Sequence, residues 1–141
     1  MIVESDAPAP FERAYFHAVF LVPHAPGAWP ERFAIITAHN PHGRVSPPDV
    51  NEKLDLALAR HLEEIGLRPF SVTGASPDLR HQEAGYGFAV GDVGTAASIS
   101  ARFRQQAFYL VEGGMLFICV DASGCEWRVG PWQERLRTSP G

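Results

Sequence analysis

Residues 33–66 have the sequence FAIITAHNPHGRVSPPDVNEKLDLALARHLEEIG, and the spacing of the apolar residues changes within it. Residues 33–38 are a short apolar and branched run, which is typical of a buried strand. From residue 48 the apolar residues recur every three or four positions with charged residues between them, which predicts an amphipathic helix that ends at Gly66. Ser46 is expected to cap this helix. The stretch therefore predicts a strand and a helix joined by a polar, proline-rich loop.

The sequence on either side extends this unit. Residues 14–22 are aromatic and branched, and we expect a strand there that forms a wide hairpin with residues 33–38. The elements expected after the first helix are strands over 69–73 and 83–90, a helix over 93–106, a hairpin over 108–121 turning at Gly113 and Gly114, and a short strand over 126–129.

This order of elements, β-β-α-β-β-α-β-β, predicts an α+β fold. It contains the β-α-β-β-α-β pattern of a ferredoxin-like split unit, here with an added N-terminal strand and a C-terminal hairpin. We expect one α+β domain over residues 1–141, with residues 1–12 and 133–141 as loosely ordered tails. A chain of this length buries about two-thirds of the surface that its unfolded form exposes. It is therefore expected to fold without disulfide bonds or a structural metal ion.

Composition and charge narrow the classes of partner. The chain is 45% hydrophobic and 20% charged, as ordinary globular proteins are. Its net charge is −4 and Lys53 is its only lysine, which disfavours nucleic acid as a partner. No apolar run approaches the ~20 residues that span a bilayer, so no membrane segment is expected.

The cysteines and the first residues of the sequence bear on the cellular compartment of the protein. Cys119 and Cys125 lack the spacing of a metal knuckle, and we expect free thiols in a reducing compartment, with a disulfide or a reactive thiol as the alternatives. The opening MIVESDAPAP lacks a basic region followed by an apolar core, so a secretory signal is not expected. Together these features favour the cytoplasm.

Several short motifs resemble one known family. They are Ile36-Thr37-Ala38-x-Asn40-Pro41, Asn51 at the start of the helix, Gly74-x-x-Pro77 followed by Glu83, and Arg102-Phe103-x-Gln105. Together they resemble a small bacterial family described only as a domain of unknown function, number 3293. The chain departs from that pattern with His81 in place of a tryptophan and Arg104 in place of a glycine. The resemblance implies an intracellular α/β domain and no particular activity.

A polar pocket is predicted where the strand ends and the helix begins. His39 and Asn40 end the strand, and Asn51 lies on the sheet-facing side of the first helical turn. With Glu83 and Arg102 they form the candidate binding site, because rigid loops over strand ends commonly hold ligands. The alternative is that the asparagines only satisfy backbone groups and that Arg102 complements the dipole of the second helix.

Other kinds of site are less well supported. At the start of the first helix, Pro47 and Pro48 remove two N–H donors and Asp49 repels an anion, which disfavours a phosphate site there. A two-histidine, one-carboxylate metal set would use His81 and Glu83 with His39 or His42. No zinc-binding helix motif supports this set, so we expect neither a metal nor a cofactor.

The leading hypothesis is a binding or regulatory module that acts through the polar pocket or through a protein-contact surface, to which Trp127 and Trp132 would contribute. Its partner would be an unknown protein or small molecule, and a homodimer through a sheet edge is a further arrangement. One alternative is a small enzyme that uses Glu83 with His39 or His81 in acid–base or metal-assisted chemistry. Another is an inhibitor or immunity-type protein. Whether the chain is an enzyme stays open at this point.

Overall fold

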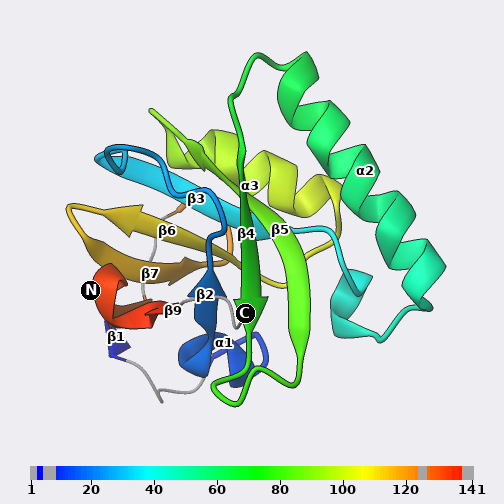
Figure 1. Cartoon of the computed structure of the whole chain (residues 1–141), viewed down its shortest axis with the longest axis horizontal. Coiled ribbons are helices and arrows are strands. Elements are labelled where there is room, and N and C mark those ends of the chain that lie inside the picture. The colour runs from blue at the N-terminus through cyan, green and yellow to red at the C-terminus, as the bar shows by residue number, and fades with distance from the viewer. Residues whose placement is uncertain (1–2, 5–8, 124–126, 138–141) are drawn as a thin grey trace.

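A computed structural model describes residues 3–4, 9–123 and 127–137, and its main feature is a curled mixed sheet (Figure 1). The strands are β1 (Val3–Glu4), β2 (Val19–Leu21), β3 (Arg32–Thr37), β4 (Phe70–Ala75), β5 (Gln82–Ala89), β6 (Phe108–Glu112), β7 (Met115–Cys119), β8 (Trp127–Pro131) and β9 (Leu136–Arg137). The helices are α1 (Ala14–His17), α2 (Pro48–Glu64) and α3 (Val93–Arg102), with 3₁₀ turns η1 (Pro41–Gly43) and η2 (Trp132–Arg135).

The order of strands across the sheet is β1-β8-β7-β6-β3-β5-β4-β2-β9. In its centre, β6, β3, β5 and β4 are antiparallel neighbours, and the chain visits them as β3-α2-β4-β5-α3-β6. This is the β-α-β-β-α-β order of elements that the sequence predicts. The fold class is therefore α+β.

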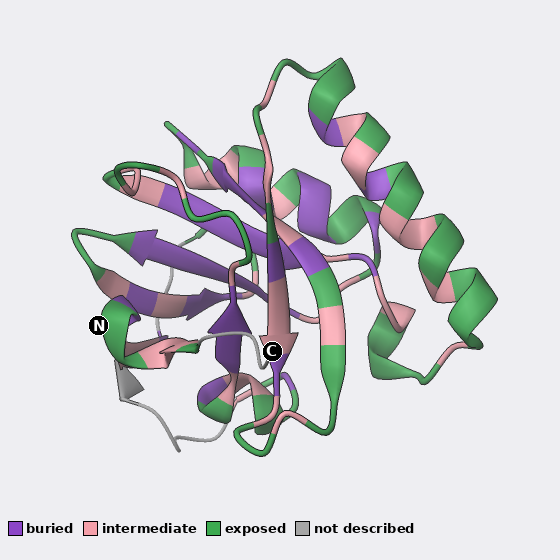
Figure 2. Ribbon diagram, in the orientation of Figure 1, coloured by how far each residue is buried: buried purple, intermediate pink, exposed green. Residues whose placement is uncertain are grey.

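Two hydrophobic cores lie on opposite faces of the sheet, because successive strand side chains alternate between faces. Leu58 and Leu62 of α2 and Ile99 of α3 pack with Ile36 and Leu110 on one face. The other face carries a cluster of aromatic and branched side chains that includes Phe16, Phe20, Phe33, Tyr109 and Trp132. Figure 2 shows buried residues along the central strands and on one side of each long helix.

The prediction of a strand over residues 14–22 is wrong for its first half. Residues Ala14–His17 form a helical turn that buries Phe16, and only Val19–Leu21 is a strand. The predicted hairpin with β3 is also wrong, since β2 pairs with β4 and β9. A short apolar run fits a buried helical turn as well as a strand, and its pairing partner is set by contacts far away in sequence.

Two predicted helix boundaries are also corrected. The second helix ends at Arg102 rather than residue 106, because Arg104 takes a left-handed conformation with φ 58°. Ser46 does not cap α2: the N-cap residue is Pro47, and the Ser46 backbone N–H donates to Asn40 Oδ1 instead (3.0 Å). The C-terminal end of α2 holds the left-handed glycine that the sequence predicts, Gly66 with φ 84°.

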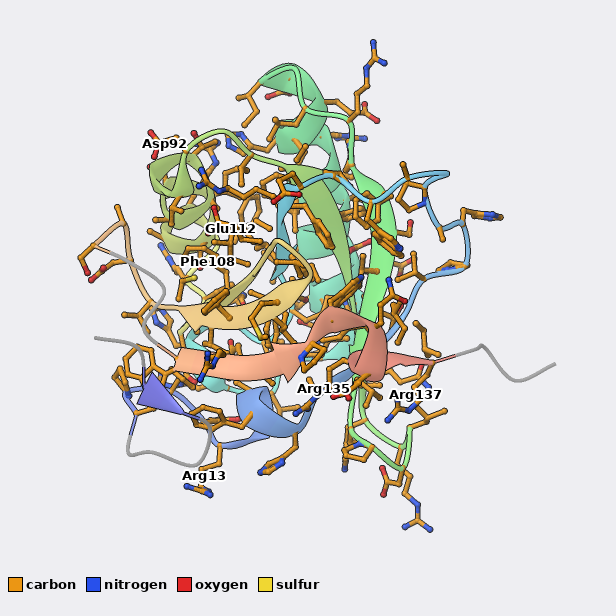
Figure 3. The ribbon with its side chains drawn as sticks, turned by 90° about the vertical axis from the view of Figure 1, so that its left-hand side faces the viewer. Arg13, Asp92, Phe108, Glu112, Arg135 and Arg137 are labelled. Carbon is orange, nitrogen blue, oxygen red and sulfur yellow. The ribbon has the colours of Figure 1, made fainter. Side chains whose placement is uncertain are left out.

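The C-terminal part of the chain folds back over the aromatic core. Trp127 and Trp132 are buried, with exposed fractions of 7% and 1%, so neither offers the protein-contact surface suggested by the sequence. Arg135 of η2 donates to the carbonyls of Phe16 (2.9 Å) and Ala18 (3.3 Å), which joins the C-terminal segment to α1 and β2 (Figure 3).

The cysteine prediction is also corrected. Cys119 is disulfide-bonded, so the expectation of a free thiol is wrong for this residue, and Cys125 lies outside the described residues. A buried cysteine at a strand end looks the same in sequence whether it is reduced or bonded, because sequence spacing alone does not fix pairing. None of the helices in the described part of the chain has the length and hydropathy needed to cross a bilayer.

Candidate functional site

Asn40 joins the end of β3 to the start of α2 and to β5. Its Nδ2 donates to Glu83 Oε1 (2.6 Å), and its Oδ1 accepts from Asn51 Nδ2 (2.9 Å) and from the Ser46 backbone N–H (3.0 Å). The Asn40 backbone N–H in turn donates to Asn51 Oδ1 (2.9 Å). We call Asn40, Ser46, Asn51 and Glu83 the Asn40 clamp.

The residue types explain why the clamp forms. Asn40 has φ 51°, a left-handed conformation that asparagine tolerates better than most residues. Its amide supplies both a donor and an acceptor, which are needed here to bond a carboxylate and two N–H groups. The sequence-predicted residues Asn40, Asn51 and Glu83 are thus brought together, and these polar atoms bond one another and the loop backbone.

A second set of bonds ties the same loop to the segment after α3. The His42 N–H donates to the Arg104 carbonyl (2.8 Å), and Gln105 Nε2 donates to the His39 carbonyl (3.1 Å). Gln106 Nε2 lies 3.4 Å from the His42 carbonyl. Sequence reasoning missed the roles of Gln105 and Gln106, and the adjacent pair of amide side chains just past the helix was the available signal.

Both histidines proposed as partners of Glu83 are held by hydrogen bonds of their backbone N–H groups. His39 is held through its backbone, with its N–H donating to Thr37 Oγ1 (3.1 Å). His81 is exposed in the connection between β4 and β5, and its N–H donates to Ser76 Oγ (3.1 Å). Within the described ranges, no three His, Cys, Asp or Glu side chains gather in a way that would hold a metal ion, so His39, His81 and Glu83 do not form the suggested ligand set.

Arg102 does not join the clamp but lines a groove of about 440 Å³ between α2 and the end of α3. The apolar lining consists of Pro41, Leu54, Ala57 and Phe103. The ionisable lining consists of Arg60, His61, Glu64, Arg102 and Arg104. No hydrogen bond links Arg102 to Glu83, so the suggestion that Arg102 orients this carboxylate is not supported by the contacts of the described residues.

The groove carries an excess of positive charge. Arg60, Arg102 and Arg104 face it, and Glu64 is the one acid among the described residues of the lining. Within the described parts of the chain, no ion pair joins any of these three guanidinium groups to a carboxylate. Arg60, His61 and Glu64 come from one stripe of α2, and the two other arginines come from the end of α3 and the residues after it. Sequence reasoning found Arg102 alone, because spacing does not show which flanks of two separate helices meet.

The opposite flank of α2 contacts the sheet through a phenol. Tyr86 Oη donates to Asp55 Oδ2 (3.1 Å), and burial, followed by the charge of Asp55, raises the pKa of Tyr86 to about 12. On the other face of the sheet, burial, followed by the charge of Glu83, raises the pKa of Tyr15 to about 12. Both phenols are therefore harder to ionise in the folded protein than in the unfolded chain.

We expect these shifts to weaken the fold at high pH. A folded-state pKa above the unfolded value of 10 contributes stability that is complete below pH 10 and is lost as pH rises through about 12. Urea unfolding at pH 9 and pH 11.5 should show a lower free energy at the higher pH. The double variant Y15F/Y86F should show a smaller fall than the parent, and an equal fall would contradict this assignment.

Comparison with known proteins identifies a family for this chain. The family described as "Protein of unknown function (DUF3293)" matches residues 36–108, which include all the residues of the clamp and of the groove lining. No curated protein and no solved structure matches the chain.

Proposed function

The chain belongs to the DUF3293 family, whose description assigns no activity, and for this member we propose a binding module that takes an anionic ligand in the groove between α2 and α3. One observation carries the proposal. Three arginines without carboxylate partners in the described part of the chain line a single groove of a protein whose net charge is −4.

The chemistry of the groove suits an anion. A guanidinium group presents a planar fork of donors that matches carboxylate and phosphate oxygens, so arginines clustered in this way favour an acidic ligand. The volume of about 440 Å³ falls in the usual size range of small-molecule sites. The apolar lining from Leu54, Ala57 and Phe103 would contact the uncharged part of such a ligand.

In this proposal the clamp supports the groove instead of forming a pocket itself. Pro41, which lines the groove, follows Asn40 directly, and the Arg104 carbonyl accepts from the His42 N–H (2.8 Å). Of the five residues expected to build a pocket, Arg102 alone would then contact the ligand. The other four would fix the position of the loop that carries Pro41 into the groove; they are His39, Asn40, Asn51 and Glu83. The alternative of an enzyme that uses Glu83 is less favoured, because Glu83 Oε1 already accepts from Asn40 Nδ2 at 2.6 Å.

We also infer that the centre of the sheet is related to the ferredoxin-like fold. The antiparallel order β6-β3-β5-β4, with α2 and α3 packed on one face, supports a ferredoxin-like split unit at the centre of the sheet. On this interpretation α1, β2 and the segments after β6 are additions to that unit within one α+β domain.

Arg102→Ala is expected to weaken the binding of benzoate, a simple apolar carboxylate, about tenfold, because a charge-assisted hydrogen bond is lost. NMR titration at low salt should show saturable shifts at the amides of Leu54, Ala57 and Phe103 in the parent protein. The matched control is Arg80→Ala, since the Arg80 side chain is 83% exposed, pairs with Asp78 at 3.9 Å and lies outside the groove lining. Equal affinities for the two variants, or shifts spread evenly over the surface, would overturn the proposal.

A further inference from the structure

We infer that the ligand of the groove is a phosphate monoester carried on a small apolar or aromatic body, and that Arg104 selects it over a carboxylate. This inference rests on the proposed function and narrows it to one chemical class. It depends on three features of the groove: its charge, its apolar lining and the backbone conformation of Arg104.

The charge of the groove matches a dianion. Arg60, Arg102 and Arg104 contribute three positive charges and Glu64 one negative charge, so the formal sum with His61 neutral is 3 − 1 = +2. A phosphate monoester carries about −1.5 to −2 at neutral pH and has three strong acceptor oxygens. A carboxylate carries a single charge and is satisfied by one bidentate arginine, which would leave two guanidinium groups uncompensated.

The apolar lining indicates that the phosphate is attached to a larger group. Pro41, Leu54, Ala57 and Phe103 line the groove, and the Phe103 ring lies 6.1 Å from the His61 ring. Inorganic phosphate would leave these surfaces in contact with water. An aromatic or aliphatic body covers them and gains affinity in proportion to the apolar area removed from water.

Arg104 occupies a backbone position where glycine is usual. The Arg104 N–H donates to the Ala101 carbonyl (3.0 Å) and the Gln105 N–H to the Ser100 carbonyl (3.0 Å), which is the bonding pattern of a Schellman end to α3. This motif places its left-handed residue at position 104, where φ is 58°. A bulky side chain is uncommon in this conformation and is disfavoured there relative to glycine. The residue therefore has a conformational cost and no bond to a carboxylate in the described chain, which points to a role in the groove.

The test compares three probes on the parent protein and on Arg104→Gly. In calorimetric or NMR titrations, phenyl phosphate should bind the parent about tenfold more tightly than benzoate or inorganic phosphate does. Arg104→Gly should lose about tenfold in affinity for phenyl phosphate and much less for benzoate. Its melting temperature should equal or exceed that of the parent, because glycine relieves the left-handed position. Asparagine also tolerates this conformation, so Arg104→Asn should show the same loss of affinity for phenyl phosphate.

Leu79→Gly is the matched control, since Leu79 is also left-handed with φ 62° but lies in the connection between β4 and β5, outside the groove lining. It should gain stability without any change in binding. Unchanged phenyl phosphate affinity in Arg104→Gly would overturn the inference. Equal affinities of the parent for phenyl phosphate and benzoate, both lost in Arg102→Ala, would overturn the phosphate assignment and leave the anion-binding function standing. Absence of binding by all three probes would overturn both.

Discussion

Asn40→Ala is expected to lower the free energy of unfolding by about 3 kcal/mol, because three side-chain hydrogen bonds of about 1 kcal/mol each are lost. The bonds connect Asn40 to Glu83, Asn51 and the Ser46 N–H, so the change releases the loop from both α2 and β5. Alanine is in addition disfavoured at φ 51°. Urea unfolding followed by circular dichroism measures the effect.

Asn40→Gly separates the two contributions. Glycine removes the same three hydrogen bonds but accepts the left-handed conformation, so this variant should be about 1 kcal/mol more stable than the alanine variant. Because the loop carries Pro41 into the groove, both variants should also bind phenyl phosphate more weakly. If Asn40→Ala unfolds at the same urea concentration as the parent, the clamp does not hold the loop in solution.

Trp132→Ala is expected to be the most destabilising substitution of the aromatic core, at about 4 kcal/mol. The Trp132 side chain is 1% exposed, and its ring centroid lies 5.1 Å from that of Phe20, 5.4 Å from Phe33 and 5.5 Å from Trp29. Alanine would leave a cavity among these rings where β2, β3 and the C-terminal segment meet. The midpoint of thermal or urea unfolding reports the loss.

Trp132→Phe is the control for cavity formation. Trp132 Nε1 is buried without a hydrogen-bond partner among the described residues, so phenylalanine removes an unsatisfied donor while keeping most of the ring contacts. We expect a loss well under half of that caused by alanine. A similar loss in both variants would show that the ring contacts are not the source of the stability.

The parts of the fold that the sequence predicts correctly depend on local signals. The helix α2 follows from its apolar spacing, and the β6–β7 hairpin follows from Gly113 and Gly114, which both have positive φ (57° and 79°). The pairing of β2 was missed, because a strand of three residues carries no information about its partner. The glycines that made residues 83–90 look like a weak strand have a structural reason: a Cβ at Gly85 would lie 2.6 Å from the Ile36 carbonyl oxygen.

Within the site too, the features set by nearby residues could be predicted and those set by distant contacts could not. Asn40 and Asn51 could be placed together because a strand end and the following helix start are close in sequence as well as in space. The groove could not be predicted, because it forms where the flank of α2 meets the residues after α3, and periodicity does not fix how two helices are rotated towards each other. For Arg104 a signal was available and was not used: this residue stands where the family pattern has a glycine, and it takes the left-handed conformation that glycine favours.

The brevity of the outermost strands bears on how copies of this protein would behave at high concentration. Among the described residues, β1 and β9 are two residues long each. An extended segment of another molecule could therefore form very few backbone hydrogen bonds with either strand. Edge-to-edge growth of the kind that seeds fibrils thus has little template along β1 and β9 themselves. An assembly of copies at these two strands would therefore depend on side-chain contacts more than on backbone pairing.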